Sequence, residues 1–349
     1  MREIFTYKRF AVITLLLVAL SGGGSVFYYY DTFYRPNVCV TEKPIYIYVP
    51  HNTTWDMLVD SIRAKGCLRS VSSFKRAAQK EQLPKRLKGG RYRLDAGMHN
   101  KSMVRTFALG LQSPVHLVIS GNIRSVERLA AVLSRPIEAD SLSMMLALTD
   151  EELICRMGFD STSLFSMIIP NTYEVYWNTA PDKIIDRLYR EYQIFWNKER
   201  RDKAASIGFS LEQVSTLASI VHEETNYKPE MPAIAGVYMN RLKSGMPLQA
   251  DPTLKFALRN HSIQRVLSRD RKIDSPYNTY MYKGLPPGPI CVPSIATLDA
   301  VLNYQHHNYI FFCASPDFNG SHLFATNLRD HNRHAKAYQQ ALNRRGIMR

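Results

Sequence analysis

The chain has 349 residues, a length that predicts two folded units with additional segments rather than one domain. Its formal net charge of +15 indicates affinity for polyanions, acidic substrates or an anionic membrane surface. Hydrophobic residues make up 45% and charged residues 21%, which argues against disorder. No zinc-finger spacing, P-loop or aromatic RNA-binding motif accompanies the charge, so we expect no nucleic acid partner.

The N-terminus carries an apolar segment that predicts a membrane-spanning helix. Residues 10–30 form a run of about 21 uncharged residues, long enough to cross a bilayer. Basic residues precede this run, and three tyrosines, 28–30, close it where an interfacial aromatic belt would lie. The positive-inside rule places residues 1–9 in the cytoplasm. We therefore expect a single-pass anchor in the cell inner (cytoplasmic) membrane with the body on the periplasmic or extracytoplasmic side. The alternative is a cleaved signal peptide, although no clear cleavage pattern is present.

A small α+β unit is predicted over residues 45–113, after a linker over residues 31–44. The expected strands and helices are, in chain order, 45–49, 54–66, 70–82 and 88–94. This β-α-α-β order resembles a LysM-like module, a type that binds glycans containing N-acetylglucosamine.

Residues 114–345 predict a larger mixed domain, so the fold class is α+β throughout. Helices are expected at 124–134, 150–157, 182–203, 232–245 and 327–342, and strands at 115–119, 310–314 and 322–325. Asp251 followed by Pro252 predicts an N-cap with proline at the first helical position.

One helix of this domain places a carboxylate on its own apolar side. Ser210 and Gln213 form a capping box that predicts the start of a helix running to Thr225. At about 100° per residue, Glu224 falls roughly 60° from the centre of the apolar stripe, whereas Glu223 points away. Burial would raise the pKa of Glu224, which suits a general acid near neutral pH. An ion pair that merely ends the helix is the structural alternative.

The stretch 275–289 is too rich in Pro, Gly, Tyr and Asn for a helix or an ordinary strand. Such a loop can build a fixed groove with stacking rings and amide hydrogen bonds, as carbohydrate sites require. It can equally be a tight structural connection.

The cysteines and histidines give no metal or redox motif. The five cysteines are scattered, and the sequence leaves open whether Cys39 and Cys67 form a disulfide. The spacings of His306, His307, His322, His331 and His334 match no zinc site. We expect neither a metal nor a cofactor.

Six motifs, taken together and in order, resemble the YceG family of endolytic murein (lytic) transglycosylases. They are Ala218-Ser219-Ile220-Val221-x-x-Glu224-Thr225, Val237-Tyr238-x-Asn240-Arg241-Leu242, Leu248-Gln249-x-Asp251-Pro252-Thr253, Tyr277-Asn278-Thr279-Tyr280, Gly284-Leu285-Pro286-Pro287-Gly288-Pro289-Ile290 and His322-x-Phe324-x-Thr326-Asn327-Leu328-x-x-His331-Asn332. The resemblance extends from the apolar N-terminal segment almost to the C-terminus.

The resemblance implies cleavage of the β-1,4 bond between N-acetylmuramic acid and N-acetylglucosamine in nascent peptidoglycan strands. The reaction consumes no water, because the muramyl unit closes on itself as a 1,6-anhydro sugar. Glu224 aligns with the family's catalytic glutamate. The substrate-binding residues carried over by the resemblance are Asn240, Arg241, Gln249, Asp251, Thr253, Asn278, Thr279, Tyr280, His322 and Asn327. Glycan strands are the implied substrate, and peptidoglycan synthases are implied partners.

Three positions depart from the family pattern as the resemblance gives it. His222 stands where many relatives carry a further Glu, Gly121–Arg124 lacks a preceding acidic residue, and Asn171 replaces Asp. Two other functions stay open. One is a two-carboxylate hydrolase in which Asp251 or Glu223 activates water. The other is a non-catalytic glycan-binding scaffold of the cell-wall machinery.

Overall fold

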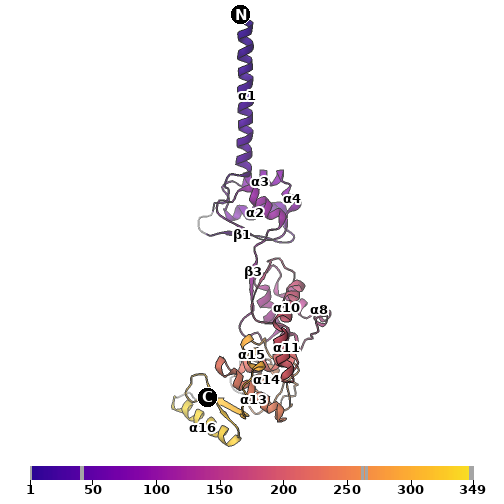
Figure 1. Cartoon of the computed structure of the whole chain (residues 1–349), viewed down its shortest axis with the longest axis vertical. Helices are drawn as coiled ribbons and strands as arrows, with labels where there is room; N and C mark the ends of the chain where they lie inside the picture. Colours follow the sequence, from indigo (N-terminus) through magenta and orange to yellow (C-terminus); the bar gives the residue numbers. More distant parts are fainter. Residues whose placement is uncertain (1, 40–42, 261–262, 264–265, 346–349) are drawn as a thin grey trace. The chain divides into compact units, whose positions relative to one another are not determined.

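The computed structural model describes residues 2–39, 43–260, 263 and 266–345, with side chains described from Val12 onward. The chain divides into two compact units (Figure 1). Unit 1 comprises Met1–His116, Pro136–Glu138 and Glu174–Thr179, and unit 2 comprises Leu117–Arg135, Ala139–Tyr173 and Ala180–Arg349. The sequence analysis placed a single domain boundary between residues 113 and 114. It did not predict that two later segments, Pro136–Glu138 and Glu174–Thr179, belong to unit 1.

Unit 1 is an antiparallel strand pair covered by helices. Its elements are β1 (Ile45–Val49), α2 (Trp55–Lys65), α3 (Val71–Lys80), α4 (Leu83–Arg86), β2 (Gly90–Leu94) and α5 (Asn100–Leu109). β1 and β2 pair from Ile45 opposite Leu94 to Val49 opposite Gly90. The core includes Phe74, Tyr92 and Phe107, which are fully buried. The order predicted for residues 45–94 is therefore present, with one additional helical turn, α4.

The long apolar helix α1 (Arg2–Phe33) ends inside the core of unit 1. Phe33 is 3% exposed, and the main-chain oxygen of Thr32 accepts a hydrogen bond from the fully buried side chain of Asn100. Asn37 and Val38 are also buried. The start of the segment predicted as a linker, residues 31–44, is thus packed into unit 1. The sequence missed this because Asn37 and Asn100 are satisfied by each other, by the Ser73 hydroxyl and by main chain far away in the sequence.

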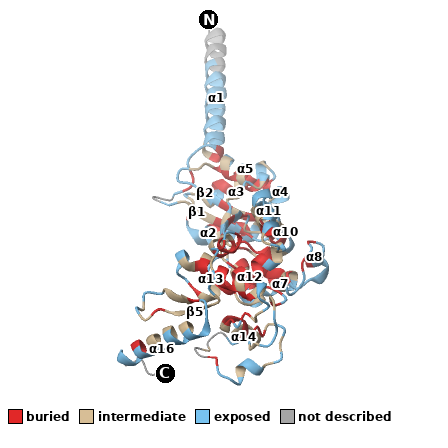
Figure 2. Ribbon diagram, turned by 60° about the horizontal axis from the view of Figure 1, so that its bottom comes forward, coloured by how far each residue is buried: buried red, intermediate tan, exposed pale blue. Residues whose placement is uncertain are grey.

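Unit 2 is mainly helical and encloses one central helix (Figure 2). Its elements, with two strands at its border, are β3 (Val115–Val118), α6 (Val126–Ser134), α7 (Ser141–Leu148), α8 (Glu151–Cys155), α9 (Leu164–Met167), β4 (Thr172–Val175), α10 (Pro181–Phe195), α11 (Lys198–Ser206), α12 (Leu211–Glu224), η1 (Lys228–Glu230), α13 (Met231–Lys243), α14 (Asp251–Ala257), η2 (Asp270–Lys272), α15 (Ile295–Leu302), β5 (Phe311–Ala314), β6 (His322–Ala325) and α16 (Leu328–Arg344). β3 pairs with β4, and β5 pairs with β6 as an antiparallel hairpin. α12 packs against α13, α15, α9 and α14.

Two predictions about unit 2 were wrong in detail. The single helix expected over residues 182–203 is broken after Phe195, because Asn197 caps a new helix by accepting from the N–H of Arg200. Asp251 is not the N-cap of α14; Ala250 holds that position, and the Asp251 side chain makes no cap bond. Asp251 instead borders the pocket described below.

Candidate active site

Glu224 is the last residue of α12, a helix whose position is strongly determined. The predicted capping box is present, with Ser210 and Gln213 bonded reciprocally. Every residue from Val214 to Val221 is buried. The hydroxyl of Ser219 accepts the N–H of Ile290 at 3.0 Å, which ties the Pro-rich loop to the middle of the helix. Because α12 is buried and tied to its neighbours, the carboxyl group of its last residue, Glu224, has a well-defined position.

The Glu224 carboxyl is partly buried and, among the residues that the structure describes, has one direct side-chain partner. The phenol of Tyr238, on α13, donates to Oε1 of Glu224 at 2.7 Å. Burial raises the pKa of Glu224 to about 7, the Tyr238 hydrogen bond opposes this, and the nearby charge of Asp251 adds to the rise. Near neutral pH, a carboxyl group with this pKa exists in both its protonated and its ionised form. A group that first donates a proton and then accepts one needs both forms.

Glu223, the competing carboxylate, is occupied elsewhere. Arg124 donates from Nε and Nη2 to the two oxygens of Glu223, each at 2.7 Å. Such a bidentate pair holds both groups in one geometry. Helical periodicity predicted that Glu223 points away from the apolar stripe; in the structure its side chain is only 13% exposed and is held by Arg124. The pair also joins the last turn of α12 to the loop that follows β3.

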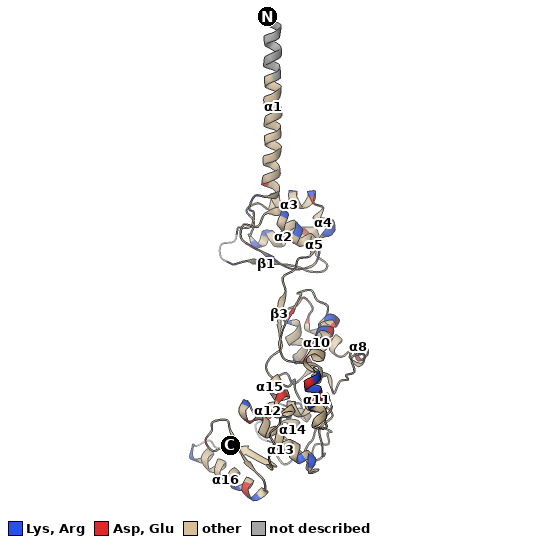
Figure 3. Ribbon diagram, viewed as in Figure 1, with Lys and Arg blue, Asp and Glu red and all other residues tan. Residues whose placement is uncertain are grey.

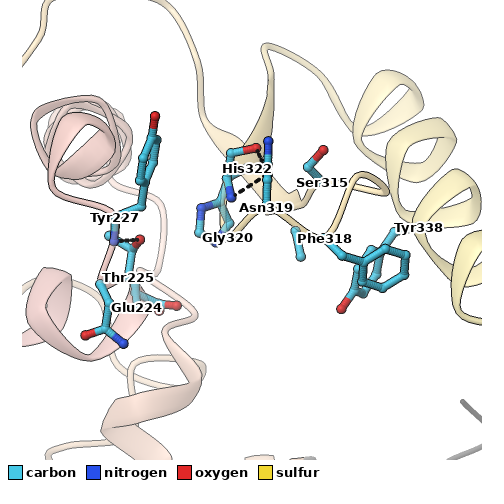
Figure 4. A pocket seen from close by; sticks show the side chains of 12 residues that line it. Glu224, Thr225, Tyr227, Ser315, Phe318, Asn319, Gly320, His322 and Tyr338 are labelled. Atoms are coloured by element: carbon cyan, nitrogen blue, oxygen red, sulfur yellow. Dashed lines mark hydrogen bonds between the residues drawn. The ribbon is translucent and has the colours of Figure 1, made fainter.

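Two pockets meet at Glu224, so the carboxyl lies between two spaces rather than at the end of one. The first, of about 510 Å³, is also bordered by Tyr238, Arg241, Asp251 and Tyr280. The second, of about 580 Å³, is also bordered by Tyr227, Phe318, His322 and Tyr338. Figure 4 shows Glu224 and Thr225 at one side of the second pocket, with Phe318 and Tyr338 across the opening.

In the first pocket a second carboxylate lies near Glu224. The phenol of Tyr280 donates to Oδ1 of Asp251 at 2.5 Å. The guanidinium of Arg271 lies over the Tyr280 ring, 4.8 Å from its centroid. Burial, followed by the bond to Asp251, raises the pKa of Tyr280. The phenol therefore stays protonated and fixes the orientation of the Asp251 carboxylate.

Arg241 and Gln249 hold the wall of the same pocket. Arg241 donates to the main-chain oxygens of Pro247 and Ile310 and to Oε1 of Gln249, the last at 2.6 Å. Gln249 has a left-handed backbone (φ 54°), a conformation that side-chain-bearing residues rarely adopt. Both residues border the first pocket with Glu224.

The other residues expected to bind substrate lie around the site in different settings. Thr253, Asn278 and Thr279 are buried, and their side chains bond to one another or to nearby main chain. Asn240 donates to the main-chain oxygens of His307 and Tyr309, and Asn327 caps α16. These five side chains support the walls. His322 borders the second pocket, where Glu230 accepts its main-chain N–H and lies 2.9 Å from its Nδ1.

The Pro-rich loop contributes to the site at its start only. Tyr280 borders the first pocket, whereas Gly284–Pro287 border a separate pocket that does not include Glu224. Gly288 is needed for packing, since a Cβ there would lie 2.0 Å from the main-chain oxygen of Thr162. The start of the loop thus lines the first pocket, whereas the part around Gly288 is a tight structural connection.

Sequence reasoning missed Tyr227, Tyr238, Arg271 and Phe318 as site residues. Tyr238 carried a usable signal, because a buried tyrosine hydroxyl normally finds a partner and a buried carboxyl needs one. Within the described ranges, no group of three or more His, Cys, Asp or Glu side chains is arranged to hold a metal ion.

Comparisons with known proteins identify the family of the chain. A family model described as "YceG-like family" matches residues 47–337. The chain belongs to the YceG-like family. A Bacillus subtilis relative named endolytic murein transglycosylase is 25% identical over 92% of each chain. A Streptococcus pneumoniae R6 protein of the same name is 23% identical over 93% of this chain and 64% of its own.

A solved structure of a YceG-like protein from Listeria monocytogenes supports the same fold. It superimposes with a TM-score of 0.54 and 24% sequence identity, covering 84% of this chain and 99% of the other. At that identity the likeness concerns the fold, which confirms a mixed α+β YceG-like architecture.

Proposed function

We propose that the chain is a membrane-anchored endolytic lytic transglycosylase of peptidoglycan. It cleaves the β-1,4 bond between N-acetylmuramic acid and N-acetylglucosamine within nascent strands, leaves a 1,6-anhydro-muramyl end, and so terminates or trims strand elongation. The observation that carries the proposal is the Glu224 carboxyl, with a pKa of about 7, at the junction of two pockets. An internal bond of a strand needs room for sugars on both sides, and the names of the relatives support this substrate.

Glu224 performs both proton transfers of this reaction. Protonated Glu224 donates to the leaving glycosidic oxygen while the bond from that oxygen to the muramyl anomeric carbon breaks. The resulting carboxylate takes the proton of the muramyl C6 hydroxyl, whose oxygen bonds to the anomeric carbon. Glu224 ends protonated, and no water is consumed. General acid–base catalysis of this kind contributes about 10²- to 10⁴-fold per transfer.

The pocket residues divide into substrate contacts and supports. Gln249, Asp251 and Tyr280 in the first pocket and His322 in the second are our substrate contacts. Arg241 uses three of its five N–H donors in the bonds described above, and the others are available to a lactyl-peptide carboxylate of the substrate. The supports are Asn240, Thr253, Asn278, Thr279 and Asn327. Fixed groups such as the Asp251 carboxylate would stabilise the positive charge that develops on the sugar.

A two-carboxylate hydrolase is the second candidate, favoured by one observation. Asp251 is close enough to Glu224 to raise its pKa, and it borders the same pocket. A carboxylate so placed could activate water. The binding-only scaffold requires no such pair of groups and is supported by nothing in the site.

Cleavage of purified peptidoglycan, followed by mass spectrometry of the products, tests the proposal. Wild-type protein should yield anhydro-muramyl ends, and Glu224→Gln should yield almost none. Glu223→Gln is the matched control, since it removes the neighbouring carboxylate, and it should retain cleavage. Reducing ends without anhydro termini would favour the hydrolase, and full activity of Glu224→Gln would reject the catalytic assignment.

Location and glycan binding by unit 1 are part of the same proposal. α1 contains a stretch, Val12–Phe33, apolar and long enough to span a bilayer. We propose that it anchors the chain in the cytoplasmic membrane with both units outside, near peptidoglycan synthases, and that unit 1 is a LysM-like glycan-binding module. Protease added to intact spheroplasts should then digest both units. Protection of the units would reverse the orientation.

A further inference from the structure

Unit 1 is basic, and several of its cations lie where the apolar helix enters it. Residues 31–116 contain 15 Lys and Arg against 6 Asp and Glu, a net +9 of the chain's +15. α3 and α5 pack against α1. Figure 2 shows α3 and α5 near the point where α1 leaves unit 1, and Figure 3 shows Lys and Arg on α3 and α4.

Three of these cations contact aromatic rings at the end of α1. Lys80 Nζ lies 5.0 Å and the Arg76 guanidinium 5.8 Å from the centroid of the Tyr28 ring. Lys101 donates to the hydroxyl of Tyr34 at 2.8 Å and lies 5.1 Å from the centroid of its ring. We call Arg76, Lys80 and Lys101 the collar of α1.

The rigid entry of α1 determines how far the collar lies from a bilayer. Residues 10–30 span about 31 Å as a helix, which matches a hydrocarbon core of roughly 30 Å. Tyr28 is then at the outer interface, and Phe33, in the core of unit 1, is only about 7 Å further along the axis. Because the Asp31 and Thr32 main-chain oxygens are bonded to Ser73 and Asn100, the helix does not end in a flexible joint.

The collar retains positive charge after its acidic neighbours are counted. Asp31 pairs with Arg35 at 2.8 Å and lies 3.9 Å from Arg76. Glu81 is near enough to act on the charge of Lys101. The collar and Arg35 thus carry four positive charges against two negative charges. Lys80 and Lys101 are exposed.

We propose that the collar binds the headgroups of anionic phospholipids in the leaflet from which α1 emerges, so that unit 1 sits directly on the membrane surface. The inference rests on the proposed membrane anchor and extends it. Basic side chains beside interfacial tyrosines match the layer of lipid phosphates. A basic residue close to an anionic surface contributes about 1 kcal/mol, or roughly fivefold in binding.

Native mass spectrometry of the full-length chain tests this proposal, with micelles containing equal amounts of phosphatidylglycerol and phosphatidylcholine. Wild-type protein should retain phosphatidylglycerol preferentially. Lys80→Gln should reduce that preference about fivefold, and the triple variant Arg76→Gln, Lys80→Gln, Lys101→Gln should abolish it. The control is Arg63→Gln, Lys65→Gln, Arg93→Gln, which removes equal charge from exposed positions on α2 and β2.

Retention of the preference by the control and its loss in the collar variants supports the proposal. Equal loss in both triple variants would show a nonspecific charge effect and overturn it, as would a wild type without preference. Thermal unfolding of each variant excludes a folding defect, with Lys80→Gln as the mildest change. Alkaline extraction of membranes separately tests the anchor, and glycan cleavage by the collar variant separately tests the enzyme.

Discussion

The phenol of Tyr238 donates a 2.7 Å hydrogen bond to Oε1 of Glu224, joining two helices at the carboxyl group proposed to be catalytic. The bond stabilises the ionised carboxylate and therefore restrains the rise in pKa that burial causes. Tyr238 itself stays protonated, because burial and the adjacent carboxylate both raise its pKa. The hydrogen bond therefore lowers the pH at which Glu224 loses its proton, against the larger effect of burial.

Tyr238→Phe should therefore shift the pH profile of glycan cleavage. The ring is retained and only the donor is lost, so the pKa of Glu224 rises above about 7. A hydrogen bond to a charged group contributes about 1.5–3 kcal/mol, equivalent to roughly one to two pH units. The alkaline limb of kcat/KM, where Glu224 loses its proton, should move upward. An unchanged or lowered limb would show that the bond does not control this ionisation.

Asp251→Asn should move the same limb in the opposite direction. The negative charge of Asp251 raises the pKa of Glu224, so its removal lowers that pKa, by on the order of one unit. If Asp251 stabilises the developing sugar charge, anhydro products persist at a reduced rate. If it activates water, products with reducing ends are lost. Product analysis across the pH range measures both the pH limb and the type of product. Tyr280→Phe is the control, because it keeps the charge of Asp251 and removes only the hydroxyl that donates to Asp251 at 2.5 Å.

The sequence predicted helix α12 more accurately than its surroundings. The capping box and the apolar period define α12 because both are local patterns of side chains within a few residues. Helical geometry favoured Glu224 over Glu223, the motif resemblance completed that choice, and in the structure Glu223 is paired with Arg124. The helix break at Asn197 also depends on a local signal, the capping side chain of Asn197. The sequence analysis missed it because the apolar residues before the break indicated one continuous helix.

The remainder depends on contacts between residues far apart in the chain. Tyr238 and Glu224 come from successive helices whose crossing no local pattern determines. Tyr280 reaches Asp251 from a loop 29 residues later. The second pocket needs the β5–β6 hairpin and α16 beside the end of α12, and Phe318 within it adopts a left-handed backbone (φ 56°) that composition cannot indicate. These relationships are tertiary, so the motif resemblance supplied the residues but not the contacts that join them.

The raised pKa of Glu224 should also reduce stability at neutral pH. Its folded value of about 7 exceeds the ordinary 4.5, so between these values the folded state binds more protons than the unfolded state. Stability is therefore lost as pH rises from 4.5 to 7, by at most about 3 kcal/mol. Glu224→Gln has no such term, and its stability relative to wild type should increase from pH 5 to pH 8 in denaturant titrations.

Asp140→Asn provides the comparison for that experiment. Asp140 caps α7 by accepting from Ser143, and these bonds lower its pKa from 3.8. Asp140 is consequently ionised in both the folded and unfolded states from pH 5 to pH 8, and the stability difference between Asp140→Asn and wild type should be constant there. A constant difference for Glu224→Gln as well would mean that Glu224 does not titrate in this range in the folded protein.

The Arg124–Glu223 ion pair should be coupled both to folding and to Glu224. Its side chains are 29% and 13% exposed, so Arg124→Gln leaves a largely buried carboxylate unpaired and should cost about 2 kcal/mol. The double variant Arg124→Gln, Glu223→Gln should recover part of this loss, as a double-mutant cycle in urea would measure.

The freed charge of Glu223 in the single variant Arg124→Gln should also raise the pKa of Glu224 and move the alkaline limb of kcat/KM upward, since that charge acts on Glu224 in the folded protein. The double variant should reverse this shift. If the stability effects of the two substitutions are additive and the alkaline limb does not move, Arg124 is coupled neither to Glu223 nor to Glu224.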